Sequence, residues 1–497
     1  MKILKRILIV AAAIVVVASA GGYGVFKYMN RTPPQLAEPN YYAYYKTQDT
    51  IPEGKIAIFI SGLFMPERFR AEDFYNLALK PMQYIPWPVR YMVMADRGIV
   101  LLDPDKFYAF EDFTPAKLVD FRGSEKDVDG IAYIEKYRRG EVQWIPPSPT
   151  VHMDHGYFLY AGRKSGIPTV ANKLITKAKV YYYGEGKGLT DGRVPHEAGE
   201  WAIAKSALDK LRAKYGDIPY RFVSAETPGA AEKYMRELLD GGAETIVLAA
   251  PTPIYSHHEQ FNGSIKHAMH YIHDWETEHG KHIKMIIQPQ LAEFPVVRQA
   301  HLQLLKDRLD TLPAGAKVKV VVSVHGMAWD KAPLEAWIEL APQYRDAMAT
   351  DVETMLGGYG FSRTEVVQAQ DHFADPYNNP TGKYLSTNKA FWDGIESGFD
   401  YVINMPIEFF SENTDTMFTH AMFNFEGFPG YDIYQPVDYP DWSVPYTRTF
   451  KVRNTEIIYN GLPVGKYNAP LIEAFYEALD SIVSKGMPAA EKMAKAP

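Results

Sequence analysis

At 497 residues the chain is longer than one ordinary domain, so two or three domains are expected. The composition is that of a folded protein, with 46% hydrophobic and 23% charged residues, and the formal net charge is −7. This charge gives no electrostatic reason to expect binding to nucleic acid or anionic lipid. The chain has no cysteine, which excludes disulfides, thiolate catalysis, zinc ribbons and iron–sulfur clusters.

The first 29 residues predict a membrane anchor. Lys2, Lys5 and Arg6 precede an uncharged stretch, residues 7–26, which at ~1.5 Å per residue is long enough to cross a ~30 Å hydrocarbon layer. The basic flank should stay in the cytoplasm, so the bulk of the chain is expected outside it, in a bacterial periplasm. The alternative is a cleaved signal peptide, because residues 18–20 read Ala-Ser-Ala, an acceptable cleavage site.

A polar, proline-bearing linker is expected at 30–54, followed by an accessory module at 55–175. The module begins with a predicted buried strand, "KIAIFISGLF" (55–64), and two short strands are expected around a turn at 96–98. This pattern favours a small α/β or mainly β unit, to which the sequence assigns no function.

From residue 176 strands alternate with helices, which predicts parallel sheets built from βαβ units. We therefore expect an α/β fold with two Rossmann-like halves, 176–300 and 301–497, the second ending in a C-terminal helix. Strands are expected at 177–186, 220–226, 243–251, 282–291, 319–325, 363–370 and 399–410, and helices at 200–216, 227–242, 263–280, 299–312, 334–356, 388–398 and 469–486.

Two strand ends carry histidines that could do chemistry, because ligands of open parallel sheets bind outside the carboxyl ends of the strands. The buried run "VVVSVHG" (320–326) ends at His325, and the strand in "LAAPTPIYSHH" leads to Tyr255, His257 and His258. A neutral imidazole can remove protons, bind a divalent metal, or do both. Taken alone, His325 also fits a purely structural role at a strand end.

A third strand end carries carboxylates. In "MPIEFFSENTDTMF" (405–418) a helix is expected to begin near Ser411 as its N-cap. Glu412 and Asp415 would then lie one turn apart on one helix face, near its positive end. Since the carboxyl ends of parallel strands share one edge, His325 and this acidic helix are expected at the same rim of the sheet.

The order of these strand ends resembles the ferrochelatases, class II chelatases that insert a divalent metal into a tetrapyrrole without ATP. The resemblance covers about 176–440. The family's chelatase histidine maps onto His325, and its catalytic acidic residue maps onto Asp415, where ferrochelatases generally carry Glu. The family pattern P-I-x-F-x-S-[DE]-x-x-[DE]-T-[LM]-[YF] is matched by Pro406, Ile407, Phe409, Ser411, Glu412, Asp415, Thr416, Met417 and Phe418.

The resemblance implies a role for each candidate residue. His325 would be the proton acceptor or a metal ligand, with Asp415 and Glu412 as an acidic relay and His257 or His258 as a secondary metal contact. The divalent metal (Fe²⁺, Co²⁺ or Ni²⁺) and the tetrapyrrole would be substrates, and no resident cofactor would be required. The ring faces would contact Tyr183, Tyr255, Met327 and Trp329.

Two alternatives stay open on the sequence. The protein could be a catalytically inactive chelatase-fold subunit that binds a tetrapyrrole or metal, or a structural component of a membrane-associated, cytochrome-type complex. Haem synthesis ends in the cytoplasm, so an exported location and Asp415 in place of Glu both allow this reading. Alternatively, a metal-storage protein could use the histidine-rich stretch that contains His267, His270 and His273.

Overall fold

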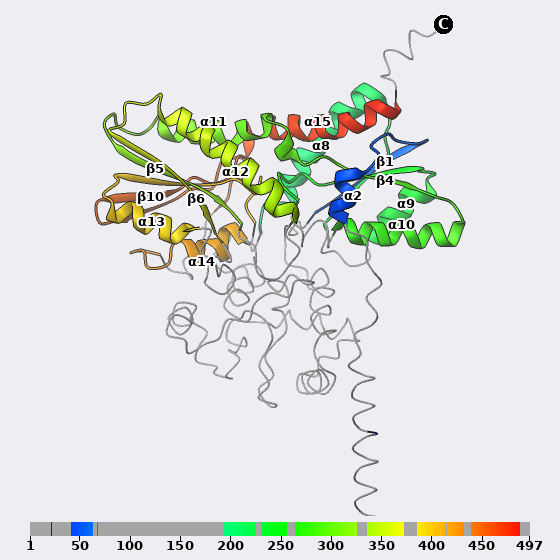
Figure 1. Ribbon diagram of the computed structural model, residues 1–497, viewed down its shortest axis with the longest axis horizontal. Coiled ribbons are helices and arrows are strands. Elements are labelled where there is room, and N and C mark those ends of the chain that lie inside the picture. Colours follow the sequence, from blue (N-terminus) through cyan, green and yellow to red (C-terminus); the bar gives the residue numbers. More distant parts are fainter. Residues whose placement is uncertain are drawn as a thin grey trace, which may run out of the picture.

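The chain forms two α/β halves side by side, each built on a largely parallel sheet with helices on both faces (Figure 1). The structure is a computed structural model that describes residues 21, 41–62, 67, 193–224, 230–255, 264–325, 335–371, 385–413, 415–431 and 439–487. The predicted class, a mixed α/β fold with two parallel-sheet halves, is confirmed for these residues.

The first half contains a four-stranded parallel sheet of order β2-β1-β3-β4. Its elements are α2 (Tyr41–Thr47), β1 (Ile56–Gly62), α8 (His196–Tyr215), β2 (Tyr220–Ser224), α9 (Ala230–Asp240), β3 (Thr245–Ala249), α10 (Lys266–His279) and β4 (Lys284–Ile287). β1 was expected in the accessory module, yet it pairs with both β2 and β3 inside this sheet. The sheet of the first half therefore includes β1, and a long segment separates β1 from α8.

The long segment leaves and re-enters the first half at neighbouring points. The Val194 N–H donates to the Glu67 carbonyl at 2.9 Å, and the Arg193 guanidinium lies 3.3 Å from the Glu67 carboxylate. The Glu67 N–H in turn donates to the Glu197 carboxylate at 3.2 Å. The two described ends that flank residues 68–192 are thus bonded to each other.

Part of the predicted linker packs against the sheet. β4 is an edge strand, and α2 lies beside it. The Tyr44 hydroxyl donates to the Met285 carbonyl at 2.5 Å. The Gln48 amide donates to the Ile287 carbonyl at 2.8 Å and accepts the Ile287 N–H at 2.7 Å. These side chains satisfy backbone groups of an edge strand that another chain could otherwise pair with.

The second half contains a six-stranded sheet of order β7-β6-β5-β8-β10-β9, parallel except for β9. Its elements are α11 (Val296–Leu309), β5 (Lys317–Val324), α12 (Glu335–Leu356), β6 (Arg363–Gln370), β7 (Leu385–Ser386), α13 (Thr387–Glu396), β8 (Tyr401–Pro406), a π-helical turn (Asp415–Thr419), α14 (His420–Asn424), β9 (Arg448–Val452), β10 (Thr455–Tyr459) and α15 (Ala469–Gly486). Two short 3₁₀ turns complete the described elements, at Leu291–Glu293 and Gly465–Tyr467. β5 is central, and its valines are fully buried, as a strand covered on both faces requires.

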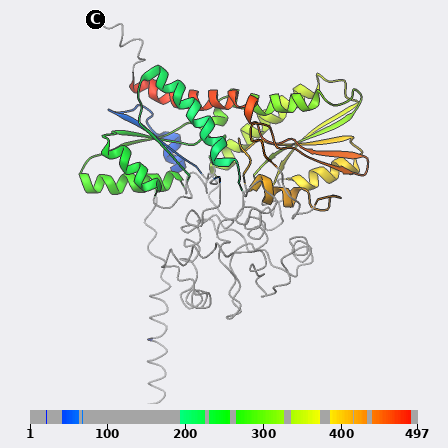
Figure 2. The ribbon, with the colours of Figure 1, turned by 180° about the vertical axis from the view of Figure 1, so that it is seen from behind.

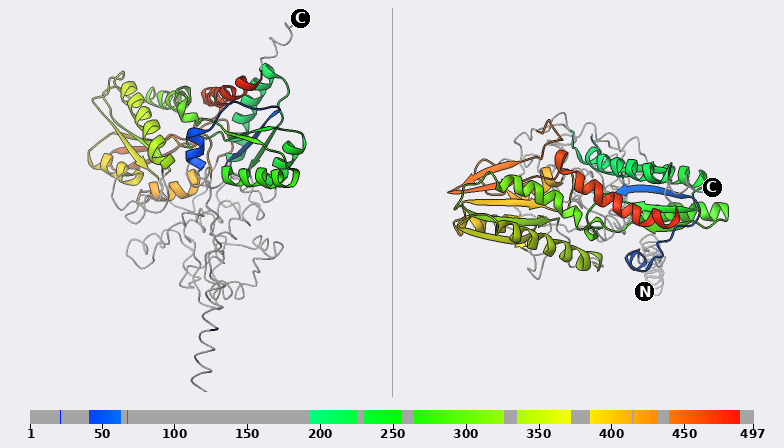
Figure 3. Two further views of the ribbon diagram at one scale, coloured as in Figure 1. Left: turned by 45° about the vertical axis from the view of Figure 1, so that its right-hand side comes forward. Right: turned by 90° about the horizontal axis from the view of Figure 1, so that it is seen from above.

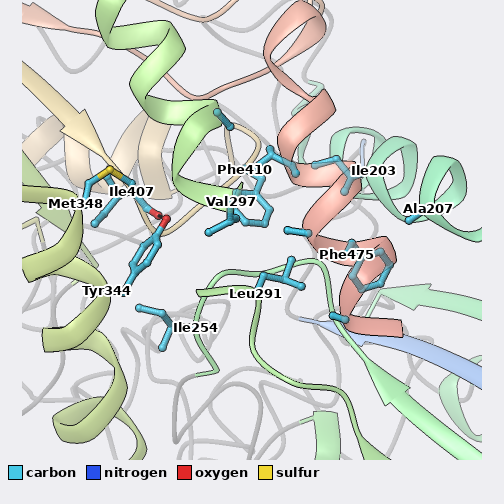
Figure 4. Close-up of a cluster of buried hydrophobic side chains, with 14 of the residues drawn as sticks. Ile203, Ala207, Ile254, Leu291, Val297, Tyr344, Met348, Ile407, Phe410 and Phe475 are labelled. Carbon is cyan, nitrogen blue, oxygen red and sulfur yellow. Dashed lines mark hydrogen bonds between the residues drawn. The ribbon is translucent and has the colours of Figure 1, made fainter. Parts of the chain in front are cut away.

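The two halves share one continuous hydrophobic core. Helix α15 packs against α8 of the first half and against α11, and Figures 2 and 3 show it lying across both halves. The core cluster includes Ile203 of α8, Val297 of α11, Phe410 beyond β8 and Phe475 of α15 (Figure 4). Because tightly packed interiors resist deformation, this shared core fixes the arrangement of the two sheets.

Candidate functional site

The carboxyl ends of β5, β6 and β8 lie next to one another because these strands pair in parallel register. His325 directly follows β5, and Asp371 directly follows β6, where its N–H donates to the Val324 carbonyl at 2.9 Å. Beyond β8, the Glu408 carboxylate accepts the backbone N–H of His325. The chain therefore gathers one imidazole and two carboxyl groups at one edge of the sheet.

Three rings pack around one another at this edge. The centroid of the His325 ring lies 5.0 Å from that of His420 and 6.1 Å from that of Phe409. The Phe409 and His420 centroids are 6.2 Å apart. His325 is 4% exposed and His420 is 2% exposed, so both imidazoles are held away from bulk water.

Asp371 is a buried carboxyl held by donors from three elements. Its Oδ1 accepts from the Thr387 hydroxyl at 2.5 Å and the Asn424 amide at 3.0 Å, and its Oδ2 accepts from the Ser323 hydroxyl at 3.1 Å. The same Oδ2 lies 3.5 Å from Nδ1 of His420. Burial raises the pKa of Asp371 to about 6, against the opposing effect of these donors and of His325.

Glu412 is fully buried, and its carboxyl is bound by a tyrosine from the neighbouring strand. The Tyr459 hydroxyl at the end of β10 lies 3.1 and 3.0 Å from the two carboxyl oxygens. Burial raises the pKa of Glu412 to about 7, although the hydroxyls of Thr416 and Tyr459 oppose the shift. Glu412 can therefore change its protonation state near neutral pH.

We expect this carboxyl to make the protein less stable as the pH rises. Between the ordinary pKa of 4.5 and the folded value of about 7, the folded state binds more protons than the unfolded state. The free energy of unfolding should therefore fall through this window, by up to about 3 kcal/mol from this group. In Glu412→Gln, which cannot ionise, that part of the fall should disappear.

Chemical denaturation of wild type and Glu412→Gln at several pH values between 5 and 8 measures this difference. The variant should gain stability over wild type as the pH rises. The control is Glu396→Gln, which changes an exposed glutamate of α13. Its free energy of unfolding should change with pH in the same way as that of wild type. Parallel curves for wild type and Glu412→Gln would contradict the prediction.

Asp415 lies at the start of the π-helical turn, in an arrangement that differs from the prediction. Ser411 does not cap this turn, since its hydroxyl donates to the Pro195 carbonyl at 3.2 Å. Instead, the Asn413 side chain accepts the N–H groups of Asp415 and Thr416 at 2.8 and 2.9 Å. Glu412 thus precedes the turn and contacts β10, so Glu412 and Asp415 do not share a helix face as predicted.

Tyr255 is 1% exposed and belongs to the core of the first half. Its backbone N–H donates to the Gln290 side chain at 2.7 Å, and its ring centroid lies 6.5 Å from that of Tyr45. Tyr255 therefore packs inside the first half, and its expected contact with the ring face of a tetrapyrrole stays a prediction. The other predicted positions, His257, His258, Tyr183, Met327 and Trp329, lie outside the described residues.

Sequence reasoning missed Asp371 and His420. Asp371 directly follows a strand that was predicted, so the rule that selected His325 could have selected it too. His420 lies five residues beyond Asp415, and its place beside His325 depends on the π-helical turn. No periodic pattern in the sequence predicts such a turn.

Within the described ranges, no group of three or more His, Asp or Glu side chains is arranged to hold a metal ion. In the histidine-rich region, His282 Nδ1 lies 2.9 Å and His273 Nδ1 lies 3.9 Å from the Glu276 carboxylate. Among the described helices, none is long and apolar enough to cross a bilayer. The expected anchor, 7–26, lies outside the described residues apart from Gly21.

No protein-family model matches the chain, and no curated protein matches it. Among solved structures, it is similar to SirB from Bacillus subtilis with Fe³⁺, at 11% identity and a TM-score of 0.35, over 60% of this chain and 92% of SirB. It is also similar to the Cra transcriptional dual regulator from Pseudomonas putida in complex with fructose 1-phosphate, at 13% identity and a TM-score of 0.25, over 58% and 88% of the two chains. Both similarities are too remote to carry an argument about function.

Proposed function

We propose that the protein is a ferrochelatase-like metal chelatase that inserts Fe²⁺, Co²⁺ or Ni²⁺ into a tetrapyrrole without ATP. The observation that carries the proposal is the grouping of His325 and His420 with the buried carboxyl groups of Asp371 and Glu408 at the carboxyl edge of the sheet. Metallation requires two pyrrole N–H protons to leave the ring while a metal enters. A neutral imidazole backed by carboxyls can accept such protons.

The protonation behaviour of the site supports this chemistry. The pKa of Asp371 is raised to about 6 and that of Glu412 to about 7, so both groups can exchange protons near neutral pH. His325 would accept protons from the tetrapyrrole, and Glu412 with Asp415 would pass them on. Apolar surroundings such as Phe409 would exclude water from this exchange.

A metal-insertion assay on the wild-type protein tests the proposal. The full chain in detergent would be mixed with a porphyrin or sirohydrochlorin and one of Fe²⁺, Co²⁺, Ni²⁺ or Zn²⁺, and the change in the ring absorption spectrum would be followed. Insertion faster than in the protein-free mixture supports a chelatase, and the preferred pair names its substrates. An unchanged rate with every pair would contradict it.

The second candidate function is that of an inactive chelatase-fold subunit, which binds a tetrapyrrole or serves a membrane-associated complex. One observation favours it: His325 is only 4% exposed, with the rings of Phe409 and His420 packed against it. A substrate must displace part of this cover to reach the imidazole. Tight binding of the ring without metal insertion would identify this second function.

The proposal extends to location. Anchoring through residues 7–26, with the bulk of the chain in a bacterial periplasm, rests on the basic flank and apolar length of the N-terminal sequence. The partners would be the tetrapyrrole and the membrane. For the second candidate function, a membrane protein complex would be a further partner. Nucleic acid is not proposed as a partner.

A further inference from the structure

We infer that Asp371 is a positioning residue of this site: it fixes the ring of His420, which packs against His325 and sets the direction in which the His325 ring points. The inference rests on the proposed function for its effect on rate. The arrangement itself is a matter of geometry, and it can be tested whether or not the protein inserts metal.

The carboxyl of Asp371 is held more firmly than a surface carboxyl would be. Thr387 and Asn424 both donate to Oδ1, at 2.5 and 3.0 Å, and Ser323 donates to Oδ2 at 3.1 Å. These donors come from the start of α13, from α14 and from β5, so three elements fix the orientation of one buried group. Ser323 is itself held by the Asn404 amide of β8 at 2.9 Å.

This fixed carboxyl acts on His420. Its Oδ2 faces Nδ1 of His420 at 3.5 Å, and both side chains are almost completely buried. A carboxylate beside one ring nitrogen favours the tautomer that carries its proton there and restricts rotation of the ring. Asp371 therefore determines which nitrogen of His420 is protonated and how the ring lies.

His420 transmits this orientation to His325 by packing. The two ring centroids are 5.0 Å apart with their planes inclined at 58°, and the Phe409 centroid lies 6.1 Å from that of His325 and 6.2 Å from that of His420. In addition, the backbone N–H of His325 donates to the Glu408 carboxylate. Since errors of about 1 Å in a reacting group can lower a rate by about a hundredfold, fixing His325 in this way has a kinetic consequence.

The variant Asp371→Asn tests the inference because it preserves size and removes the charge. Thr387 and Asn424 both donate to Oδ1, so they should hold the amide oxygen of the new side chain in that place. Its NH₂ group would then face His420 and donate to Nδ1, which reverses the tautomer. NMR of the ring nitrogens reads this change directly, without any assay of activity.

The expected kinetic result is a fall in kcat for metal insertion of about ten- to a hundredfold, with KM for the tetrapyrrole nearly unchanged. In His420→Phe, which keeps an aromatic ring but removes both nitrogens, kcat should fall by a similar factor. The matched control is Asp393→Asn, which changes an exposed carboxyl of α13 that pairs with Lys389 at 3.0 Å. This control should behave as wild type.

Three outcomes separate the possibilities. A changed tautomer of His420 together with the split between kcat and KM supports the inference. An unchanged tautomer, or full activity in both Asp371→Asn and His420→Phe, overturns it. If wild type inserts no metal but Asp371→Asn changes the tautomer of His420 and shifts the His325 resonances, the positioning stands and the proposed function fails.

Discussion

Replacing His325 with alanine is expected to lower the rate of metal insertion by about a hundredfold or more. Removing a positioned acid–base group typically costs ~10²- to 10⁴-fold, and no second described imidazole occupies the end of β5. His420, the nearest described histidine ring, is held against Asp371. The measurement is kcat/KM for insertion from the ring absorption spectrum, with ring binding followed separately by fluorescence.

The loss must come from chemistry rather than from unfolding. Thermal unfolding of His325→Ala should show a cooperative transition, and the tetrapyrrole should still bind. His270→Ala, which removes an exposed histidine of α10, provides the matched control and should retain full activity. If His325→Ala is folded and keeps more than about a third of the wild-type rate, His325 has no role in proton transfer.

Replacing Phe410 with alanine is expected to lower the free energy of unfolding by about 3–5 kcal/mol, as for other fully buried aromatic side chains. Phe410 is 1% exposed and lies in the core that both halves share. In Figure 4 its ring lies close to Val297 of α11, with Ile203 of α8 in the same cluster. Its removal would therefore leave a cavity between the halves rather than inside one of them.

Chemical denaturation followed by circular dichroism and tryptophan fluorescence measures this loss. Trp201 and Trp275 belong to the first half and Trp392 to the second, so the signal reports on both. The control Phe361→Ala removes a half-buried ring that stacks on Tyr359 at 5.1 Å, and should cost about 1 kcal/mol. A loss below about 1 kcal/mol for Phe410→Ala would show that the shared core is not as tightly packed as described.

The sequence predicted best those elements that its local pattern determines. β6 was predicted at 363–370 and α15 at 469–486, and both have these bounds in the structure. The long helix expected at 334–356 spans Glu335–Leu356 among the described residues. Long runs with one clear period specify such elements without help from distant contacts.

Elements that depend on distant contacts were predicted less well. The strand at β1 was expected, but its pairing with β2 and β3 spans more than 150 residues, which no local pattern reveals. The hairpin of β9 and β10 was missed because Arg453 occupies its turn with a φ of 56°. The two-residue turn is Arg453-Asn454, so its asparagine is a turn signal that sequence reasoning overlooked, whereas arginine rarely adopts the left-handed conformation found at Arg453.

In the candidate site too, features that follow from a local rule were predicted, and features that depend on distant contacts were not. The rule for parallel sheets placed His325 at the carboxyl edge, and the structure finds it there. The cap was assigned to Ser411 because serine is a good N-cap, but Ser411 bonds to Pro195 of the first half and Asn413 caps the turn. Both residues are competent caps, and tertiary packing decides between them.

The hydrogen-bonded junction at Glu67 and Val194 has a consequence for how this protein can change over evolution. Because Glu67 and Val194 are hydrogen-bonded, the two described ends meet, and the entropic cost of closing a flexible loop between such ends grows only with the logarithm of its length. Doubling or halving such a loop changes that cost by only about 0.6 kcal/mol. The sheet and shared core therefore place little thermodynamic limit on the length of chain between these two ends, and the described halves should keep their architecture when that length changes.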